Sequence, residues 1–299
     1  MGSSHPMYDW TIYILQLTTK NTIDMKTKIT SKLAFIMTIL AIMAMVACQT
    51  TQGSKGGKDS ETLATDSIAL IQEDSIASVE IILDYPTKGS RPLIDSLRQF
   101  LATTLGVDTL YAANPDSLLR HALQLGYTEM KKEYDDLQTF REGELPTMGY
   151  SYHIKKDVET NNYVTYIVEY YEYRGGAHGG TIIWGNTFRK DNGKSLGWNM
   201  LTNTDSKEFQ QLIKDGIRSY FQANDSTVIT DDQLKDMLII ETDIDHLPLP
   251  QFDPFLTDQG ISFIYQQYEI AAYAMGLPSF VVPYDKLKPF LTQEVSTLF

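Results

Sequence analysis

Hydrophobic residues recur along the chain with two different spacings. Short segments rich in β-branched and aromatic residues, or alternating with polar ones, are typical of strands, whereas apolar residues three and four apart predict amphipathic helices. The strand pattern covers 76–85, 149–173, 181–189 and segments around 255–265 and 281. The helical pattern covers 92–105, 115–140 with an expected break at Gly126, 206–224 and 231–240.

Turn and capping residues divide these segments. Asn161-Asn162 separates two runs of alternating residues, which predicts a β-hairpin, and Asp191-Asn192-Gly193-Lys194 predicts a second turn. Asp205 or Ser206 is positioned to cap the helix that follows. Helices mixed with antiparallel hairpins predict an α+β fold with packed amphipathic helices and mixed or antiparallel sheets.

The N-terminal region has the pattern of a targeting sequence. Lys26, Lys28 and Lys32 precede an apolar run of about fifteen residues, which is signal-peptide length and shorter than the roughly 20 residues of a membrane-spanning helix. Met45-Val46-Ala47-Cys48 resembles a bacterial lipobox, which implies cleavage before Cys48 and acylation of its thiol and new amino group. The alternative is a short buried helix that happens to contain a cysteine.

This interpretation divides the chain into five parts. Residues 1–24 fit no signal sequence and are expected to be a misannotated leader, and 25–47 are the predicted lipoprotein signal peptide. Residues 48–75 are predicted to be a flexible tether, because 50–67 are rich in Gly, Ser, Thr, Lys and Asp. Two α+β subdomains are expected at 76–190 and 191–299. Deletion of the tether as far as Ser67 is expected to leave stability unchanged.

Composition and charge narrow the function. The chain is 42% hydrophobic and 11% aromatic, which is enough for a buried core. Its 25 basic and 38 acidic residues give a net charge of −13, so nucleic-acid binding is not expected. Cleavage before Cys48 would bring the charge to about −15, and a surface of this charge favours a basic partner. The single cysteine excludes an intramolecular disulfide and a thiolate metal cluster.

Three segments resemble the extracytoplasmic domain shared by RsiV-type anti-sigma factors and the C-terminal half of PdaC-type peptidoglycan deacetylases. They are YEYRGGAHG at 171–179, the turn at 191–194 with the helix after it, and FLTDQGISFIY at 255–265 followed by YEIAAYAMG at 268–276. The resemblance covers roughly 78–292 and implies two interlocked subdomains. RsiV-like proteins bind lysozyme through this domain. The sigma-binding segment and the deacetylase half have no counterpart in the pattern of this sequence.

Two loops of the resembling segments hold the candidate site residues. His178 lies among glycines that permit close backbone approach, and with Glu269 as its orienting carboxylate it is a weak candidate for a general base. The alternative is a corner between strands in which the imidazole bonds main-chain carbonyls. The two loops are expected to meet, with a tyrosine hydroxyl bonded to Glu269. They form either one binding rim that is open to solvent or a buried aromatic plug. The predicted rim consists of Tyr173, Arg174, His178, Tyr268, Glu269 and Tyr273.

Two further clusters have a structural and a functional interpretation. An acidic group would suit calcium, but it lacks the spacing of an EF-hand, so a solvated face is expected and no metal or cofactor is predicted. Seven tyrosines crowd the hairpin, either as a sugar- or protein-binding face or as core. The acidic residues are Asp231, Asp232, Asp236, Glu241, Asp243 and Asp245, and the tyrosines are Tyr150, Tyr152, Tyr163, Tyr166, Tyr170, Tyr171 and Tyr173.

These features together predict a lipid-anchored, non-catalytic binding protein of the bacterial cell envelope. Its expected ligand is a basic protein, lysozyme-like by the resemblance, or cell-wall glycan. Its membrane partner is the lipid bilayer through acylated Cys48, and the expected location is the outer membrane, facing the periplasm. The alternative is a cell-wall glycan hydrolase or deacetylase that uses His178 and Glu269.

Overall fold

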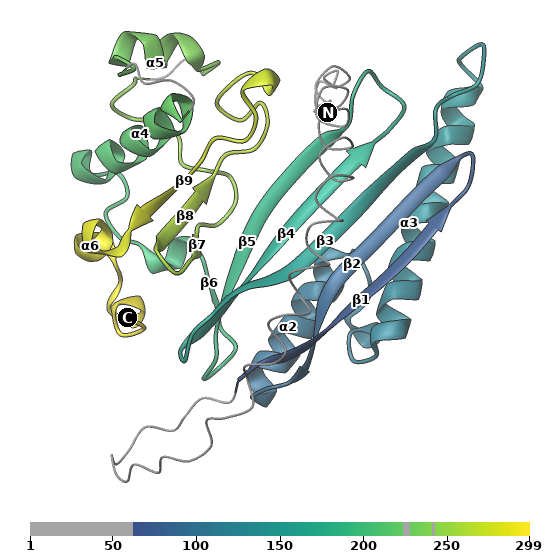
Figure 1. Ribbon diagram of the computed structural model, residues 1–299, viewed down its shortest axis with the longest axis horizontal. Coiled ribbons are helices and arrows are strands. Elements are labelled where there is room, and N and C mark those ends of the chain that lie inside the picture. The colour runs from purple at the N-terminus through teal and green to yellow at the C-terminus, as the bar shows by residue number, and fades with distance from the viewer. Residues whose placement is uncertain (1–61, 224–227, 241–242) are drawn as a thin grey trace, which may run out of the picture. The chain divides into compact units, whose positions relative to one another are not determined.

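A computed structural model describes residues 62–223, 228–240 and 243–299 (Figure 1). Apart from 176–178, these residues belong to one compact unit. The predicted leader, the signal peptide and Cys48 lie outside the described residues. In the part of the chain that is described, no helix is long and apolar enough to cross a bilayer.

A six-stranded mixed sheet forms the larger part of this unit (Figure 1). Its neighbours are antiparallel except β2 and β3, which are parallel. Two helices lie between β2 and β3 in the sequence, and such a crossover is what a parallel pair requires. In sheet order the strands are β1 (Ala64–Glu73), β2 (Ala77–Lys88), β3 (Met148–Glu159), β4 (Tyr163–Tyr173), β5 (Gly180–Arg189) and β6 (Ser195–Leu196).

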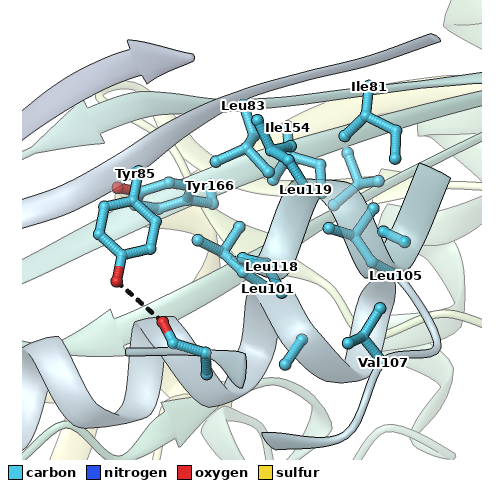
Figure 2. Close-up of a cluster of buried hydrophobic side chains, with 14 of the residues drawn as sticks. Ile81, Leu83, Tyr85, Leu101, Leu105, Val107, Leu118, Leu119, Ile154 and Tyr166 are labelled. Atoms are coloured by element: carbon cyan, nitrogen blue, oxygen red, sulfur yellow. Dashed lines mark hydrogen bonds between the residues drawn. The ribbon is translucent and has the colours of Figure 1, made fainter. Parts of the chain in front are cut away.

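Helices α2 (Arg91–Thr104) and α3 (Pro115–Gln138) pack on one face of this sheet, with the short 3-10 helix η1 (Thr109–Tyr111) between them. Their leucines, spaced three and four apart, are buried against Ile81 and Leu83 of β2 (Figure 2). The Tyr85 hydroxyl donates to the carbonyl of Ala112 over 2.8 Å at the edge of this core (Figure 2). Buried apolar area is therefore what holds the two helices on the sheet.

Helix α3 continues through Gly126, so the predicted break is wrong. Gly126 is buried, and a Cβ atom at this position would overlap the hydroxyl of Tyr150 on β3. The glycine therefore permits close approach of helix and strand. Asn114 caps α3 by accepting from Ser117 N, 2.9 Å away.

The second part of the unit has its own hydrophobic cluster, in which α4 (Lys207–Gln222) buries Phe209, Ile213 and Ile217. Ser206 caps α4 by accepting from Phe209 N. A three-stranded antiparallel sheet packs with α4. It consists of β7 (Phe255–Leu256), β8 (Gly260–Ile264) and β9 (Ser279–Pro283). The remaining elements are η2 (Trp198–Met200), α5 (Asp231–Met237), η3 (Tyr273–Met275), α6 (Tyr284–Leu287), η4 (Lys288–Phe290) and α7 (Gln293–Ser296).

The two sheets meet where β7 lies against β4 and β5. Thr165 donates its hydroxyl to the carbonyl of Leu256 over 2.7 Å, and Thr187 Oγ1 accepts from Leu256 N over 2.9 Å. Both threonines are fully buried. These bonds satisfy the main chain of β7, which has only two residues and pairs on its other side with β8.

The α+β class with mixed and antiparallel sheets is confirmed. The predicted tether is wrong from Leu63 onward, because Leu63 is buried and Ala64–Glu73 form edge strand β1. In β1 only Ile68 and Leu70 pack against the core, so most of the strand faces water and its composition resembles that of a linker. The boundary between 190 and 191 stays a prediction.

Candidate functional site

The free edge of β5 is covered by two glutamine side chains that follow β8. Strand β6 pairs only with Thr187 and Phe188, so the rest of that edge has no neighbouring strand. Gln266 accepts from Ile183 N over 3.1 Å and donates to Ile183 O over 2.8 Å. Gln267 accepts from Thr181 N over 3.0 Å. The amides thus take the place of a paired strand, and an exposed template for pairing with other chains is removed.

The bond from Thr181 to Gln267 also brings the ends of the two predicted site loops together. Thr181 follows Gly180 directly, and Gln267 directly precedes Tyr268. Neither glutamine was identified from the sequence. Two adjacent amide side chains at the end of a strand are too common a pattern to indicate this pairing.

Glu269 organises the turn that starts at Gln266. Its two carboxylate oxygens accept from Gln251 N and Gln266 N, each over 2.6 Å. The expected donor was a tyrosine hydroxyl, whereas these donors are main-chain N–H groups. Burial raises the pKa of Glu269, although the two N–H donors act in the opposite direction. Tyr268, inside the same turn, has a φ of 63°, an uncommon value for a residue with a side chain.

The other predicted rim residues have different surroundings. Tyr268 and Tyr273 are stacked, with ring centroids 5.8 Å apart, and both are half-buried. His178 is buried, with 8% of its surface exposed. Tyr173 ends β4 and Arg174 follows it. The structure thus groups Tyr268, Glu269 and Tyr273 on one segment, and the roles proposed for these side chains stay predictions.

Arg174 is held by three glutamates. Its Nε donates to Glu172 over 2.8 Å, and its terminal nitrogens pair with Glu133 and, over 3.2 Å, with Glu129. Burial lowers the pKa of Arg174, but the carboxylates raise it by more. Glu129 and Glu133 were missed at the sequence level, although their spacing of four places both on one face of α3. Arg174 therefore links the end of β4 to α3.

The tyrosines of the hairpin divide between core and a half-buried cluster. Tyr163 and Tyr166 are buried. Tyr150, Tyr152 and Tyr170 lie with ring centroids 4.6–5.7 Å apart, and burial raises the pKa of all three hydroxyls. Because they pack on one another beside Arg174, these three rings form an aromatic end to the helix-covered core.

Two residues of the acidic cluster, Asp231 and Asp245, pair with cations of the protein itself. The ammonium of Lys214, whose side chain is 7% exposed, pairs with Asp231 and Asp245, and Arg218 pairs with Asp231 and Asp215. The hydrogen bond from Lys214 lowers the pKa of Asp245. Glu241 lies outside the described residues, and among those described no group of His, Cys, Asp and Glu is placed to hold a metal ion.

Two open clefts border α4. One, of about 560 Å³, is lined by charged and amide side chains that include Lys207, Lys214 and Asp243. The other, of about 400 Å³, runs between α4 and β9. The polar groups of the first cleft are largely committed, because Lys214 is paired and Gln210 bonds Thr204 O and Leu247 N.

Comparison with known proteins finds a family match for part of the chain. Residues 156–285 match the model of a protein family of unknown function, DUF3298. No curated protein matches the chain. The chain is similar to the crystal structure of a DUF3298 family member from Bacteroides fragilis NCTC 9343, with 23% identity and a TM-score of 0.63 over 79% of this chain and 96% of that one.

The chain is also similar to a DUF3298 family protein from Pseudomonas aeruginosa PAO1, with 17% identity and a TM-score of 0.51 over 80% of this chain and 98% of that one. At this identity both likenesses show a shared fold. The matched segment begins in β3, ends in α6, and includes Arg174, His178 and Glu269. Residues 156–285 of this chain therefore match the DUF3298 family model, and the chain has an α+β fold similar to that of solved DUF3298 structures.

Proposed function

We propose that this protein is a lipid-anchored, non-catalytic binding protein of the bacterial cell envelope. Its ligand is a basic protein of the lysozyme type or, as the alternative, cell-wall glycan. The likeness to RsiV-type and PdaC-type proteins, carried by YEYRGGAHG at 171–179 and the segments after it, supports this class of ligand.

The engagement of Glu269 is the observation that favours binding over catalysis. Both oxygens of this carboxylate accept main-chain N–H bonds, so they position the loop at Gln251 and the turn at Gln266. A general base must direct a lone pair at its substrate, whereas the two main-chain donors fix the orientation of the Glu269 carboxylate towards the backbone. Glu269 therefore suits a structural role that fixes the shape of the surface around Tyr268 and Tyr273.

The net negative charge of the chain favours a positively charged partner. A net charge of −13 gives the molecule a negative field that attracts cationic proteins and repels anionic ones. Anionic lipid headgroups are repelled as well, so attachment to the membrane depends on the acyl chains at Cys48.

Calorimetric titration of the full chain, purified in mild detergent, with hen lysozyme tests the proposal. Binding is expected at low ionic strength and should weaken as salt screens the charges. Soluble peptidoglycan fragments form the second arm, and binding of uncharged fragments should be insensitive to salt. If neither lysozyme nor the fragments bind at low ionic strength, the proposal is wrong.

The lipid anchor has its own test. In Cys48→Ser the thiol that would be acylated is absent, so metabolic labelling with palmitate should lose the labelled band. After cell fractionation, Cys48→Ser should be absent from the outer-membrane fraction. Palmitate incorporation that persists in Cys48→Ser contradicts the anchor and leaves the binding proposal standing.

One observation favours the catalytic alternative. Burial raises the pKa of Glu269, and a raised carboxyl pKa is what a general acid near neutral pH requires. A hydrolase or deacetylase of this kind would convert peptidoglycan fragments, and both His178→Ala and Glu269→Gln would abolish the turnover. Absence of turnover by the wild-type chain is the outcome expected from the binding proposal.

A further inference from the structure

The end of α3 exposes apolar side chains to solvent. Every residue from Asp135 to Glu144 is exposed, in the last turn of the helix and the loop towards β3 (Figure 1). The Phe140 side chain is 89% exposed, and Leu137, three residues earlier, is 38% exposed. Phe140 lies in the turn after α3, and its N–H bonds Leu137 O over 3.0 Å, so the two residues are held within one turn of the chain.

Hydrogen bonds give this segment a defined conformation. Gln138 donates its side-chain amide to Gly143 O over 2.8 Å, Thr139 donates its hydroxyl to Asp136 O over 2.7 Å, and Phe140 N bonds Leu137 O over 3.0 Å. The loop is also attached to the body of the protein, because Leu145 is buried. Phe140 is therefore held outward by an ordered loop instead of packing on the nearby core.

The charges around Phe140 are acidic and unneutralised. Glu133 and Glu129, one and two turns before Leu137, pair with Arg174. Four later carboxylates have no ion-pair partner among the described residues: Asp135, Asp136, Glu142 and Glu144. Arg141 is the one basic residue in the segment 135–144. Asp135 and Asp136 also lie at the negative end of the helix dipole, in a last turn that has no basic residue.

This arrangement is unfavourable for the helix and favourable for a cationic partner. Binding surfaces combine an apolar anchor that enters a pocket with a polar rim whose charge complements the partner. Phe140 and Leu137 supply the anchor, and the four carboxylates supply a rim that is mainly negative, with Arg141 as its one basic residue. A local arrangement that costs stability without a visible structural gain is expected at functional sites.

We propose that the α3 tip, defined as residues 135–144, is a docking surface for a basic protein. Phe140 enters an apolar pocket of the partner, and the carboxylates face its lysines and arginines. The class of partner rests on the function proposed above. Arg174, one of the predicted rim residues, pairs with Glu133 on the turn of α3 before Leu137, which places it one helical turn from the α3 tip.

The test compares variants of the full chain in detergent, with hen lysozyme and cytochrome c as basic probes. Phe140→Ser is expected to weaken binding by about tenfold or more, as for an interface anchor. Asp135→Asn with Asp136→Asn should weaken binding and flatten its dependence on salt. Leu110→Ser is the matched control, because Leu110 is 84% exposed but lies before the start of α3, and it should bind like the wild type.

The outcomes separate the two proposals. Because all substituted side chains are exposed, no variant should melt below the wild type, and removal of two negative charges from the last turn of α3 should leave the double variant at least as stable. If wild type and Phe140→Ser bind a probe equally, the α3 tip is not the docking surface, and the proposed function still stands. If the wild type binds neither basic protein at low ionic strength, the proposed partner class and the docking surface are both wrong.

Discussion

At the scale of single residues, the polar side chains around the predicted site form hydrogen bonds to the main chain. Glu269 bonds two backbone N–H groups, Gln266 bonds both main-chain groups of Ile183, and Gln267 bonds Thr181. Gln266 is buried, and a buried polar group costs about 1–3 kcal/mol if it is left without a partner. The need to satisfy these groups explains why polar residues stand in a stretch that is otherwise apolar and aromatic.

Glu269→Gln tests this role. The amide keeps one acceptor oxygen but places an NH₂ group against a backbone donor, so we expect a loss of about 1–2 kcal/mol in the free energy of unfolding at pH 7. Because burial raises the folded-state pKa of Glu269 above 4.5, its contribution to stability is present below that pH and declines as pH rises through the folded pKa. Urea unfolding between pH 4 and 7 should show this decline in the wild type and not in Glu269→Gln. If the free energy of unfolding depends on pH in the same way in the wild type and in Glu269→Gln, the pH dependence does not come from Glu269.

At the scale of elements, one glutamate joins three strands. Glu159 at the end of β3 accepts from Leu63 N before β1 over 2.7 Å and from Lys190 after β5 over 2.7 Å, and it pairs with Lys156 over 2.9 Å. The Lys190 side chain is 4% exposed, so the Glu159 carboxylate replaces water as the group that stabilises its buried ammonium. Three chain segments that are remote in the sequence are thus held at one corner of the sheet.

Glu159→Gln should destabilise the fold by about 3 kcal/mol, because a buried ammonium would lose its counter-charge. Burial raises the pKa of Glu159, but its partners lower it by more, so the pKa lies below 4.5. The stabilisation is therefore present above pH 4.5 and is lost as pH falls through the folded pKa. Chemical denaturation measures both effects.

A matched control for this substitution is Lys194→Gln. It breaks the exposed pair with Glu294 and should cost less than about 1 kcal/mol. Equal losses in Glu159→Gln and Lys194→Gln would mean that burial of Lys190 adds nothing.

At the scale of the whole molecule, two hydrophobic clusters share the six-stranded sheet. Tyr166 and Val168 of β4 belong to the cluster under α2 and α3, whereas Tyr163 of the same strand belongs to the cluster around α4. A strand that supplies side chains to both clusters couples them, and cooperative unfolding of the described unit is expected.

The start of the folded unit can be located by truncation. A chain beginning at Thr62 keeps Leu63 and β1, so its melting temperature should match that of the full chain. A chain beginning at Ile68 loses buried Leu63 and four residues of β1, and should melt several degrees lower. Scanning calorimetry compares the two, and equal melting temperatures would restore the original expectation that the chain up to Ser67 is a tether.

Local patterns in the sequence were sufficient for most elements. The leucines of α2, the caps Asn114 and Ser206, and the alternation on both sides of Asn161-Asn162 predict helices and a hairpin, because the period of a helix or strand is visible within a few residues. The α+β class follows from these elements. The resemblance segments fall largely within the residues that match the DUF3298 family model.

Tertiary structure alone decided which remote residues meet. The parallel contact of β2 with β3 and the bonds of Gln266 to β5 each join residues that no local pattern connects. Gly126 shows the same limit, because within its helix it resembles a break and only the approach of Tyr150 explains it. Sequence period records which face of an element is buried, whereas the partner on that face depends on how the whole chain packs.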